Sequence, residues 1–378
     1  MDLSTICVHG CDKRYDTTGA VAVPIFASAT FAHPGVGQST GFDYSRSLNP
    51  TVEHLEQKIA ALEGGAYAVA FSSGMAAVSA LMELFAPGDH IIASEDLYGG
   101  TFRLFFHISQ KNGIKVSYVN TLEDIEKEIT PSTRAVFIET PTNPMMRVTD
   151  IAAVAQITHQ RKLLLIVDNT FLTPYFQRPL SLGADIVLHS GTKYLGGHND
   201  TLSGMLVVKD FILYDSLRFI AKTTGACLSP FDSFLVIRGI KTLAIRMERQ
   251  QETAMAIARW LTGQSAIKTV YYIGLPEHPG YEISRRQTSG FGGMISFSVR
   301  DEQTAKKILE SVKIIKYAES LGGVESLITY PMLQTHADMP ESDRIARGID
   351  ACLLRLSVGL ESADDLIADL KQAIESGA

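Results

Sequence analysis

Apolar positions recur with two different spacings through the first half of the chain. Between residues 51 and 63 they fall every three or four positions, which is the spacing of one face of a helix. The same spacing predicts further helices over 75–85, 103–111 and 149–161. Short runs that are apolar throughout predict strands over 67–71, 90–94, 116–120, 134–140, 162–168 and 184–190. Because strands of this kind are buried on both faces when helices separate them, the pattern predicts an α/β fold with a mostly parallel sheet.

The pattern changes at both ends of the chain. Residues 1–50 have few periodic runs and carry several glycines and prolines, so we expect an irregular arm that lies over another part of the assembly. A long helical pattern covers 241–262, and the strands beyond it are fewer and more alternating, as in 292–300. Further helices are predicted over 302–311 and 362–376. These changes predict three parts, namely an arm (1–50), a large α/β unit (51–244) and a smaller α+β unit (245–378).

Composition and charge exclude several classes of protein. The chain has 378 residues and a formal net charge of -7 without a basic block, so neither nucleic acid nor an anionic membrane is expected as a partner. Its apolar runs fall far short of the ~20 residues of a membrane span, and its first residues lack the features of a signal peptide. We therefore expect a cytoplasmic enzyme. The four cysteines, Cys7 and Cys11 among them, show no CxxC spacing, which predicts reduced thiols and no metal site.

Polar residues follow several of the predicted strands, at the edge where open α/β sheets bind their ligands. The Ser-Ser-Gly stretch 72–74 opens a helix, where free N–H groups suit a phosphate; an ordinary serine N-cap is the alternative. Asp168 ends an apolar strand, so its carboxyl is expected to be buried and to need a partner. The alternative for Asp168 is a cap on the residues that follow it.

Two more strand ends carry candidate chemistry. Lys193 lies in a turn rich in small hydroxyl residues after the strand 184–190, where a desolvated lysine can form a Schiff base. An isolated lysine in a loop is otherwise a surface residue. The stretch 139–144 joins a strand to a turn with two prolines and offers the amide of Asn143; a purely structural turn is the alternative. A phosphate cradle, a buried aspartate, an amide and a reactive lysine are together what pyridoxal 5'-phosphate (PLP) requires.

Motifs along the whole chain resemble those of the transsulfuration family of fold-type I PLP enzymes, the Cys/Met metabolism enzymes. The matching stretches are Tyr44-Ser-Arg46, Asn49-Pro-Thr51, Ser72-Ser-Gly-Met75, Asp96-Leu-Tyr98-Gly-Gly100, Asn143-Pro144, Val167-Asp168-Asn169-Thr170, His189-Ser-Gly-Thr-Lys193-Tyr194, Ser320-Leu-Gly-Gly-Val-Glu-Ser326, Thr335-His336 and Leu354-Arg355-Leu-Ser357. The resemblance extends from about residue 5 to residue 375. It implies the aspartate aminotransferase-like fold, PLP as cofactor, and an activity that cleaves or forms the C–S bond of cystathionine or a related amino acid.

The resemblance also implies how the cofactor is held. Lys193 resembles the lysine that binds the cofactor covalently and moves protons, and Asp168 resembles the partner of the pyridine nitrogen. Tyr98 matches the tyrosine that stacks on the ring and joins proton transfer, and Asn143 the residue near the phenolic oxygen. The residues that match the phosphate cradle are Gly74, Met75, Ser190 and Thr192.

The resemblance implies an oligomeric state through residues of the predicted arm, and a site for the substrate carboxylate through residues of the second unit. In the family, residues matching Tyr44 and Arg46 reach the cofactor phosphate of a neighbouring subunit, which implies a homotetramer built as a dimer of dimers. Arg355 matches the arginine that binds the substrate carboxylate, and Ser320 lies beside it in the family pattern.

Two acids bear on the substrate. Asp43 and Glu319 match acids that lie near the distal ammonium of the substrate in γ-specific members, and an unpaired carboxylate favours a cationic substrate end. We therefore expect γ-elimination or γ-replacement, as in a cystathionine γ-lyase or γ-synthase. The alternatives are a cystathionine β-lyase, then a methionine γ-lyase or an O-acetylhomoserine sulfhydrylase. A local salt bridge at Glu319 is the structural alternative.

Two other classes of protein fit the sequence less well. A nicotinamide oxidoreductase needs a GxGxxG turn after a first strand, and none of the strand ends supplies one. A non-catalytic binding protein on the same scaffold is conceivable because a fold does not determine a function. The joint presence of Lys193, Asp168, Tyr98 and Arg355 argues against it.

Overall fold

The computed structural model describes residues 1–10, 18–337 and 339–375. The larger of its two sheets has seven strands in the order β1-β7-β6-β5-β4-β2-β3. These strands are β1 (Tyr67–Phe71), β2 (His90–Ser94), β3 (Lys115–Val119), β4 (Thr133–Glu139), β5 (Leu164–Asp168), β6 (Ile186–Ser190) and β7 (Gly204–Val208). Only β7 runs antiparallel to its neighbours. The predicted mostly parallel sheet is confirmed, and β7 is the strand that we did not predict.

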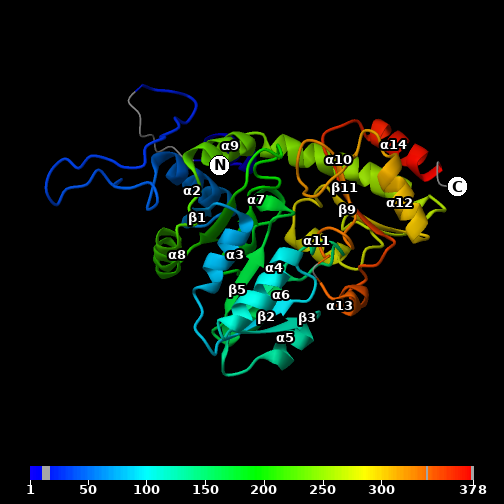
Figure 1. Cartoon of the computed structure of the whole chain (residues 1–378), viewed down its shortest axis with the longest axis horizontal. Helices are drawn as coiled ribbons and strands as arrows, with labels where there is room; N and C mark the ends of the chain where they lie inside the picture. Colours follow the sequence, from blue (N-terminus) through cyan, green and yellow to red (C-terminus); the bar gives the residue numbers. More distant parts are fainter. Residues whose placement is uncertain (11–17, 338, 376–378) are drawn as a thin grey trace.

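Helices cover both faces of this sheet, as Figure 1 shows. They are α2 (Pro50–Glu63), α3 (Gly74–Met82), α4 (Gly99–Arg103), the π-helix η1 (Leu104–Ser109), α5 (Leu122–Glu128), α6 (Ile151–Gln160), α7 (Thr173–Phe176), the 3-10 helix η2 (Pro179–Ser181), α8 (Phe211–Thr224) and α9 (Pro230–Ile240). Val167 packs in the core with residues of α2 and α6, whereas its neighbour Ile166 packs with residues of α3 and α8. Successive side chains of a strand point to opposite faces, so helices on both sides explain why these strands are apolar throughout.

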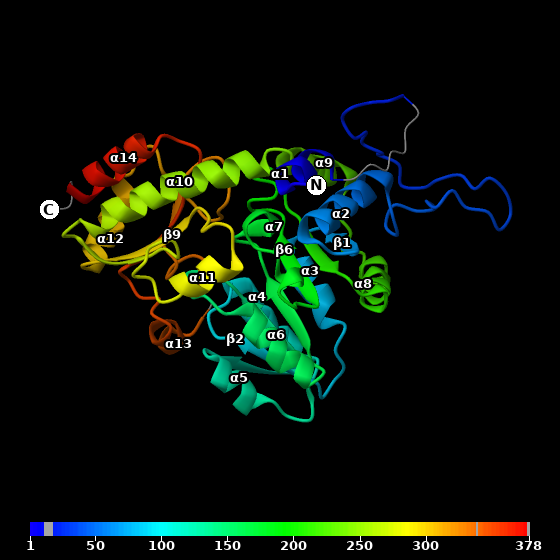
Figure 2. The same cartoon turned by 180° about the vertical axis from the view of Figure 1, so that it is seen from behind.

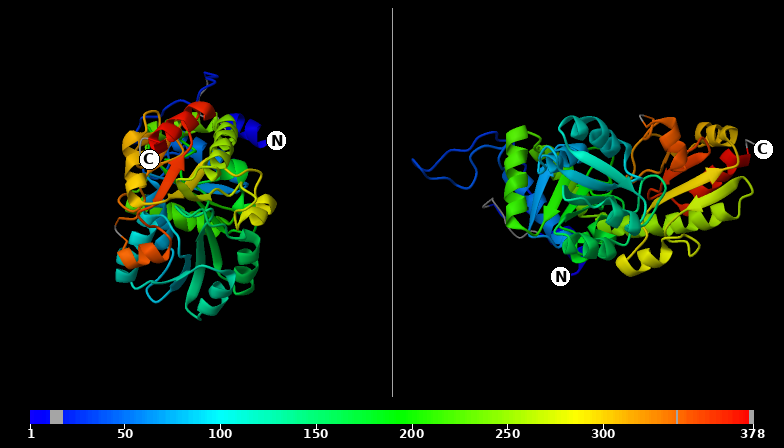
Figure 3. Two further views of the ribbon diagram at one scale, coloured as in Figure 1. Left: turned by 90° about the vertical axis from the view of Figure 1, so that its right-hand side faces the viewer. Right: turned by 90° about the horizontal axis from the view of Figure 1, so that it is seen from below.

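A second sheet of five strands lies beside the first, in the order β10-β11-β12-β9-β8. Its strands are β8 (Ile267–Tyr271), β9 (Met294–Val299), β10 (Lys316–Tyr317), β11 (Leu327–Thr329) and β12 (Leu353–Ser357). Its helices are α10 (Leu243–Thr262), α11 (Tyr281–Gln287), α12 (Glu302–Ser311), α13 (Glu341–Ala346) and α14 (Ala363–Glu375). Figure 3 shows α10 running along both units. The sequence placed the boundary between the two units at residue 245. The helix α10 runs through this residue without a break, so the boundary stays a prediction.

The N-terminal segment is only partly irregular, so the prediction of an irregular arm from residue 1 was wrong for its first residues. They form α1 (Leu3–His9), where the Asp2 carboxylate accepts a bond of 2.9 Å from the N–H of Ser4. Cys7 is fully buried in the core that α2 and α10 share, which holds α1 against the body. From residue 18 to 48 the described chain has no helix, and a long loop projects away from the body (Figure 1, Figure 2).

Other predictions concern local features. The helix expected over 103–111 begins earlier, with α4, and continues as η1. Cys7, Cys227 and Cys352 are free thiols, and Cys11 lies outside the described residues. In the part of the chain that the structure describes, no group of three or more His, Cys, Asp or Glu side chains is arranged to hold a metal ion. None of the helices described there has both the length and the apolar character that crossing a membrane requires.

Candidate active site

A cavity of about 330 Å³ lies at the carboxyl ends of the strands of the large sheet, where the second unit meets the first. Its wall contains most of the predicted site residues, namely Gly74, Met75, Tyr98, Asn143, Asp168, Ser190, Thr192, Lys193, Glu319, Ser320 and Arg355. The structure thus brings together residues that are up to 281 positions apart in the sequence (355 − 74 = 281). Three predicted residues, Asp43, Tyr44 and Arg46, are not part of this wall.

The phosphate end of the predicted site is the start of α3. The Ser73 hydroxyl accepts a bond of 3.0 Å from the N–H of Ala76, so the N-cap that we considered as an alternative is present. A Cβ on Gly74 would lie 3.0 Å from the Cβ and the Oγ of Ser190, so a side chain at position 74 would close this end of the cavity. A small residue is required here, and first-turn N–H groups of a helix suit an anion.

Asp168 ends β5 with its carboxyl buried. Its Oδ1 accepts two bonds from Thr170, of 3.0 Å from the backbone N–H and 2.6 Å from the hydroxyl. Both bonds end on Oδ1, so Oδ2 remains able to accept from a donor in the cavity. Burial raises the pKa of Asp168, and the two donors of Thr170 oppose that rise because they favour the carboxylate.

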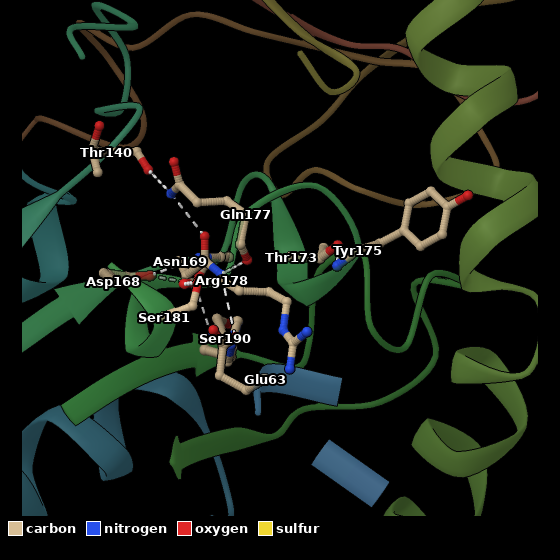
Figure 4. Close-up of polar contacts among 12 residues, drawn as sticks. Glu63, Thr140, Asp168, Asn169, Thr173, Tyr175, Gln177, Arg178, Ser181 and Ser190 are labelled. Atoms are coloured by element: carbon tan, nitrogen blue, oxygen red, sulfur yellow. Dashed lines mark hydrogen bonds and ion pairs between the residues drawn. The ribbon is translucent and has the colours of Figure 1, made fainter. Parts of the chain in front are cut away.

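A buried polar network surrounds Asn169, the residue that follows Asp168 (Figure 4). The Asn169 amide donates to the carbonyl oxygen of Gln177 at 2.7 Å and to the Glu63 carboxyl at 3.3 Å. The Glu63 carboxyl also lies 2.8 Å from Nε2 of His189, which precedes Ser190. Neither Glu63 nor His189 has an exposed side chain. The network therefore fixes two adjacent strand ends that carry cavity residues.

Lys193 lies in the loop that follows β6 and is largely buried. Its Nζ donates a bond of 3.0 Å to Oγ of Ser320, which belongs to the second unit. Burial lowers the pKa of Lys193 to about 8, helped by the positive charge of Arg355 and opposed by Glu319. A substantial fraction of this amine is therefore neutral near pH 8, as nucleophilic attack on an aldehyde requires.

Arg355 projects from β12 and is almost completely buried. Its Nη1 donates to the side-chain oxygen of Asn143 at 2.8 Å, and its Nη2 donates to the carbonyl oxygen of Ser320 at 3.0 Å and to Thr329 at 3.1 Å. Its Nε has no partner in the described part of the chain. An orphaned buried N–H on a fixed guanidinium suits a substrate carboxylate.

Tyr98 begins α4 with its ring half-exposed. Its backbone N–H donates a bond of 2.9 Å to Oε2 of Glu139, at the end of β4. A Cβ on Gly99 would lie 2.0 Å from the carbonyl oxygen of Thr335, so the turn at Tyr98 packs directly on the loop before α13. His336 in that loop is buried and lies 3.4 Å from the carbonyl oxygen of Leu97 through Nε2.

Sequence reasoning assigned no role to Glu139 or His336. Both residues stood inside stretches that we singled out, but only a strand register or a contact between distant loops could show what they touch.

The three predicted residues of the arm lie elsewhere in this chain. Asp43 is exposed, accepts a bond of 2.6 Å from the Ser39 hydroxyl and lies 3.7 Å from the ring of His33. Tyr44 is exposed, and the Arg46 guanidinium donates a bond of 2.6 Å to the carbonyl oxygen of Lys222. Within one chain these residues do not join Lys193, and their action in a neighbouring subunit stays a prediction.

Comparison with known proteins decides the family. Residues 4–375 match the model of the family described as Cys/Met metabolism PLP-dependent enzymes. The chain belongs to this family. A cystathionine gamma-lyase from Bacillus subtilis (strain 168) is 48% identical over 378 residues, with 100% of both chains covered. A cystathionine gamma-synthase from Haemophilus influenzae (strain ATCC 51907 / DSM 11121 / KW20 / Rd) is 50% identical, with 98% of this chain and 97% of that protein covered.

Two further relatives complete the comparison. A cystathionine beta-lyase from Lactococcus lactis subsp. cremoris (strain MG1363) is 48% identical, with 99% of each chain covered. The crystal structure of a cystathionine gamma-lyase from Lactobacillus plantarum, complexed with L-serine, has a TM-score of 0.98 and is 43% identical, with 100% of this chain and 99% of that chain covered. The fold and the family that the motifs implied are thus confirmed. The relatives carry three different reaction names at almost equal identity.

As a member of the Cys/Met metabolism PLP-dependent enzymes, this protein is an enzyme whose cofactor is PLP. The cavity fits that cofactor in three respects that the structure shows. Position 74 leaves space beside the start of α3, where a Cβ would intrude. Asp168 has one oxygen free of internal bonds, and the Lys193 amine has a lowered pKa. The individual roles of these residues remain proposals.

Proposed function

We propose that this enzyme acts at the bond between the sulfur and the γ-carbon of cystathionine, either breaking it by γ-elimination or forming it by γ-replacement. The observation that carries the proposal is the position of Glu319 on the cavity wall, directly before Ser320 and in the same cavity as Lys193 and Arg355. Arg355 suits the α-carboxylate of an amino acid, and Glu319 suits a cationic group at the other end of the substrate. Cystathionine carries both groups.

Arg355, Lys193 and Ser320 each have a separate role in the proposed reaction. PLP, when bound, supplies the electron sink that accepts the negative charge developed at the α-carbon. Arg355 would hold the substrate carboxylate through Nε, the guanidinium nitrogen that has no partner among the described residues, while its Nη atoms bond to Asn143, Ser320 and Thr329. Lys193, as a neutral amine, takes up the α-proton at Nζ, and Ser320 accepts a hydrogen bond from that atom.

Several residues hold the cofactor in this proposal. Asp168 would keep a proton on the pyridine nitrogen, and Tyr98 would cover the ring and take part in moving protons. Thr170 favours the ionised form of Asp168, which is the form that this role needs. The residues proposed to hold the phosphate and the phenolic oxygen are Gly74, Met75, Ser190, Thr192 and Asn143.

The assembly and its location are part of the same proposal. We propose a homotetramer, a dimer of dimers, in which Asp43, Tyr44 and Arg46 of one subunit complete the cavity of its neighbour. The support is the loop that projects from the body and carries these residues outside the cavity of their own chain (Figure 2). The cytoplasmic location inferred from the sequence is proposed on composition alone.

Two incubations test the proposal, one with L-cystathionine as the sole substrate and one with O-acetylhomoserine and cysteine. Release of cysteine and 2-oxobutyrate supports γ-elimination, and formation of cystathionine from O-acetylhomoserine and cysteine supports γ-replacement. Homocysteine and pyruvate as the main products would show a β-lyase instead and remove the role given to Glu319.

A matched pair of variants tests the position of the distal group. Glu319→Gln is expected to raise the KM for cystathionine about tenfold, since bonds to charged groups contribute ~1.5–3 kcal/mol. Glu310→Gln, on the exposed side of α12, is the control that should leave KM unchanged.

A further inference from the structure

Glu139 is a second carboxyl beside Asp168, and the mechanism above does not use it. Glu139 ends β4 and Asp168 ends β5, and the register of these parallel strands places the two residues directly opposite each other. Side chains paired in this way lie on the same face, on strands about 4.8 Å apart. Both line the cavity, and they are only 5% and 9% exposed.

The side chain of Gln177 connects the ends of the two strands by hydrogen bonds. The Gln177 amide donates one bond of 2.9 Å to the carbonyl oxygen of Thr140 and another of 2.9 Å to the side-chain oxygen of Asn169. Thr140 and Asn169 are the residues that follow Glu139 and Asp168. Figure 4 shows these two hydrogen bonds of Gln177. The carboxyls are therefore held side by side and cannot separate to relieve their repulsion.

The surroundings of the pair favour an ionised Asp168 and a neutral Glu139. Thr170 donates two bonds to Asp168. The charge of a further buried carboxyl, that of Asp96, raises the pKa of Glu139, and the Arg355 guanidinium, which attracts Glu139, is bonded to Asn143 and Ser320. Burial and the charge of Asp168 raise the pKa of Glu139 well above its usual value, whereas backbone donors at Tyr98 and Asn143 only oppose that rise. A negative charge on Asp168 therefore disfavours a second negative charge on Glu139.

Glu139 also touches a residue of the proposed chemistry. Its Oε2 accepts the bond of 2.9 Å from the N–H of Tyr98, which is the first residue of the turn into α4. The carbonyl oxygen of a neutral carboxylic acid can accept such a bond. Without an acceptor at this point, the Tyr98 N–H would lose its partner and the turn that carries the ring would lose its anchor.

We propose that Glu139 is a positioning residue of the active site: as a neutral carboxylic acid it anchors the backbone at Tyr98 and leaves the negative charge of the pair on Asp168. This role goes beyond the proposed function, because it holds whichever C–S bond the enzyme breaks. Glutamine has nearly the same shape as a neutral glutamic acid, carries no charge and keeps a carbonyl oxygen that can accept the bond from Tyr98. The substitution Glu139→Gln therefore tests the proposal.

Two variants of the PLP-loaded enzyme separate the possibilities. Glu139→Gln keeps the acceptor and the neutral state, whereas Glu139→Leu removes the acceptor. We expect kcat/KM of Glu139→Gln to exceed that of Glu139→Leu by about tenfold, the effect of one buried unsatisfied donor. The assay uses L-cystathionine, or O-acetylhomoserine with cysteine, whichever the wild type turns over faster. Equal values for the two variants, high or low, would overturn the proposal.

Infrared spectroscopy provides a readout that needs no substrate and no Leu variant. The difference spectrum of wild type minus Glu139→Gln at neutral pH should contain the C=O stretch of a protonated carboxylic acid. A carboxylate band in its place would show that Glu139 is ionised, and the proposal would be wrong even if the Gln variant were active. Because no turnover is measured, failure of the proposed γ-chemistry leaves this result unaffected.

Discussion

The Nζ of Lys193 lies 3.0 Å from the Oγ of Ser320, and this hydrogen bond joins the two units of the chain. Lys193 follows β6 of the large sheet, and Ser320 lies between β10 and β11 of the small one. A Cβ on Gly322 would lie 2.6 Å from the N of Tyr194, so the Ser320 loop packs directly on the lysine loop. This close packing buries the amine. The reactivity of Lys193 therefore depends on the contact between the two units.

The first prediction concerns the rate at which apoenzyme binds PLP covalently. Only the neutral Lys193 amine can attack the aldehyde, and burial lowers its pKa to about 8. We expect the rate to rise roughly tenfold per pH unit at low pH and to level off above about pH 8, because the neutral fraction follows the pKa. Stopped-flow absorbance measures the rate.

A variant at Glu319 tests the direction in which a neighbouring charge shifts the pKa of Lys193. Glu319 raises the pKa of Lys193, so Glu319→Gln should move the midpoint of the rate profile to lower pH. A midpoint that stays in place or moves to higher pH would contradict the electrostatic account of the lysine.

The second prediction concerns recognition of the substrate carboxylate. Three acceptors hold the Nη atoms of Arg355, and its Nε remains for the substrate. A lysine has a single ammonium group and cannot bind the three protein acceptors and the substrate carboxylate at the same time. Arg355→Lys should therefore raise KM roughly 100-fold, the upper range for bonds between charged groups. The cofactor absorbance should persist, and Arg285→Lys on α11, with an exposed side chain, provides the control. An unchanged KM would exclude Arg355 from the carboxylate site.

The third prediction tests the contact between the Tyr98 turn and the Thr335 loop. A Cβ on Gly99 would lie 2.0 Å from the carbonyl oxygen of Thr335, a backbone atom that cannot move alone. Gly99→Ala should displace the turn, destabilise the fold by ~1–3 kcal/mol as overpacking does, and lower kcat/KM. Gly35→Ala is the matched control, because its nearest contact at 3.4 Å is a flexible glutamine side chain. Equal melting temperatures and activities for both variants would show that this contact does not matter.

The sequence predicted those parts of the fold that depend on local pattern. Buried strands such as β5 and β6 are largely apolar, so their ends could be located within two residues, with Asp168 as the last residue of β5 and Lys193 soon after β6. We did not predict β7, although Met205–Val208 is a buried apolar run, because no helical segment separates it from the loop after Lys193. We did not predict α1, a helix of seven residues in which Cys7 is buried and Leu3 and Ile6 are partly buried against the same core.

The site was predictable where a strand end or a motif pointed to the residue. Gly74, Asp168, Lys193 and Arg355 lie in motifs, and the structure places all four on one cavity wall. The position of Glu139 opposite Asp168 depends on the register of two strands, which no local pattern encodes. The contact of His336 with the carbonyl oxygen of Leu97 likewise joins residues 239 positions apart, and no local pattern encodes it.

The last prediction tests whether the arm completes the cavity of a neighbouring subunit. Arg46 lies outside the cavity that contains Lys193 of its own chain. Lys193→Ala and Arg46→Ala should each abolish or strongly reduce activity as homo-oligomers. When both chains are co-expressed with different tags and the hybrid is purified, one cavity of a mixed dimer combines an intact Lys193 with an intact Arg46. We therefore expect activity to return to about half of the wild-type value per mixed dimer, since one of its two sites is complete. A hybrid as inactive as its parents would show that Arg46 acts only within its own chain. A co-expressed pair of Lys193→Ala and Asp168→Ala should stay inactive, because these two residues belong to the cavity of one chain.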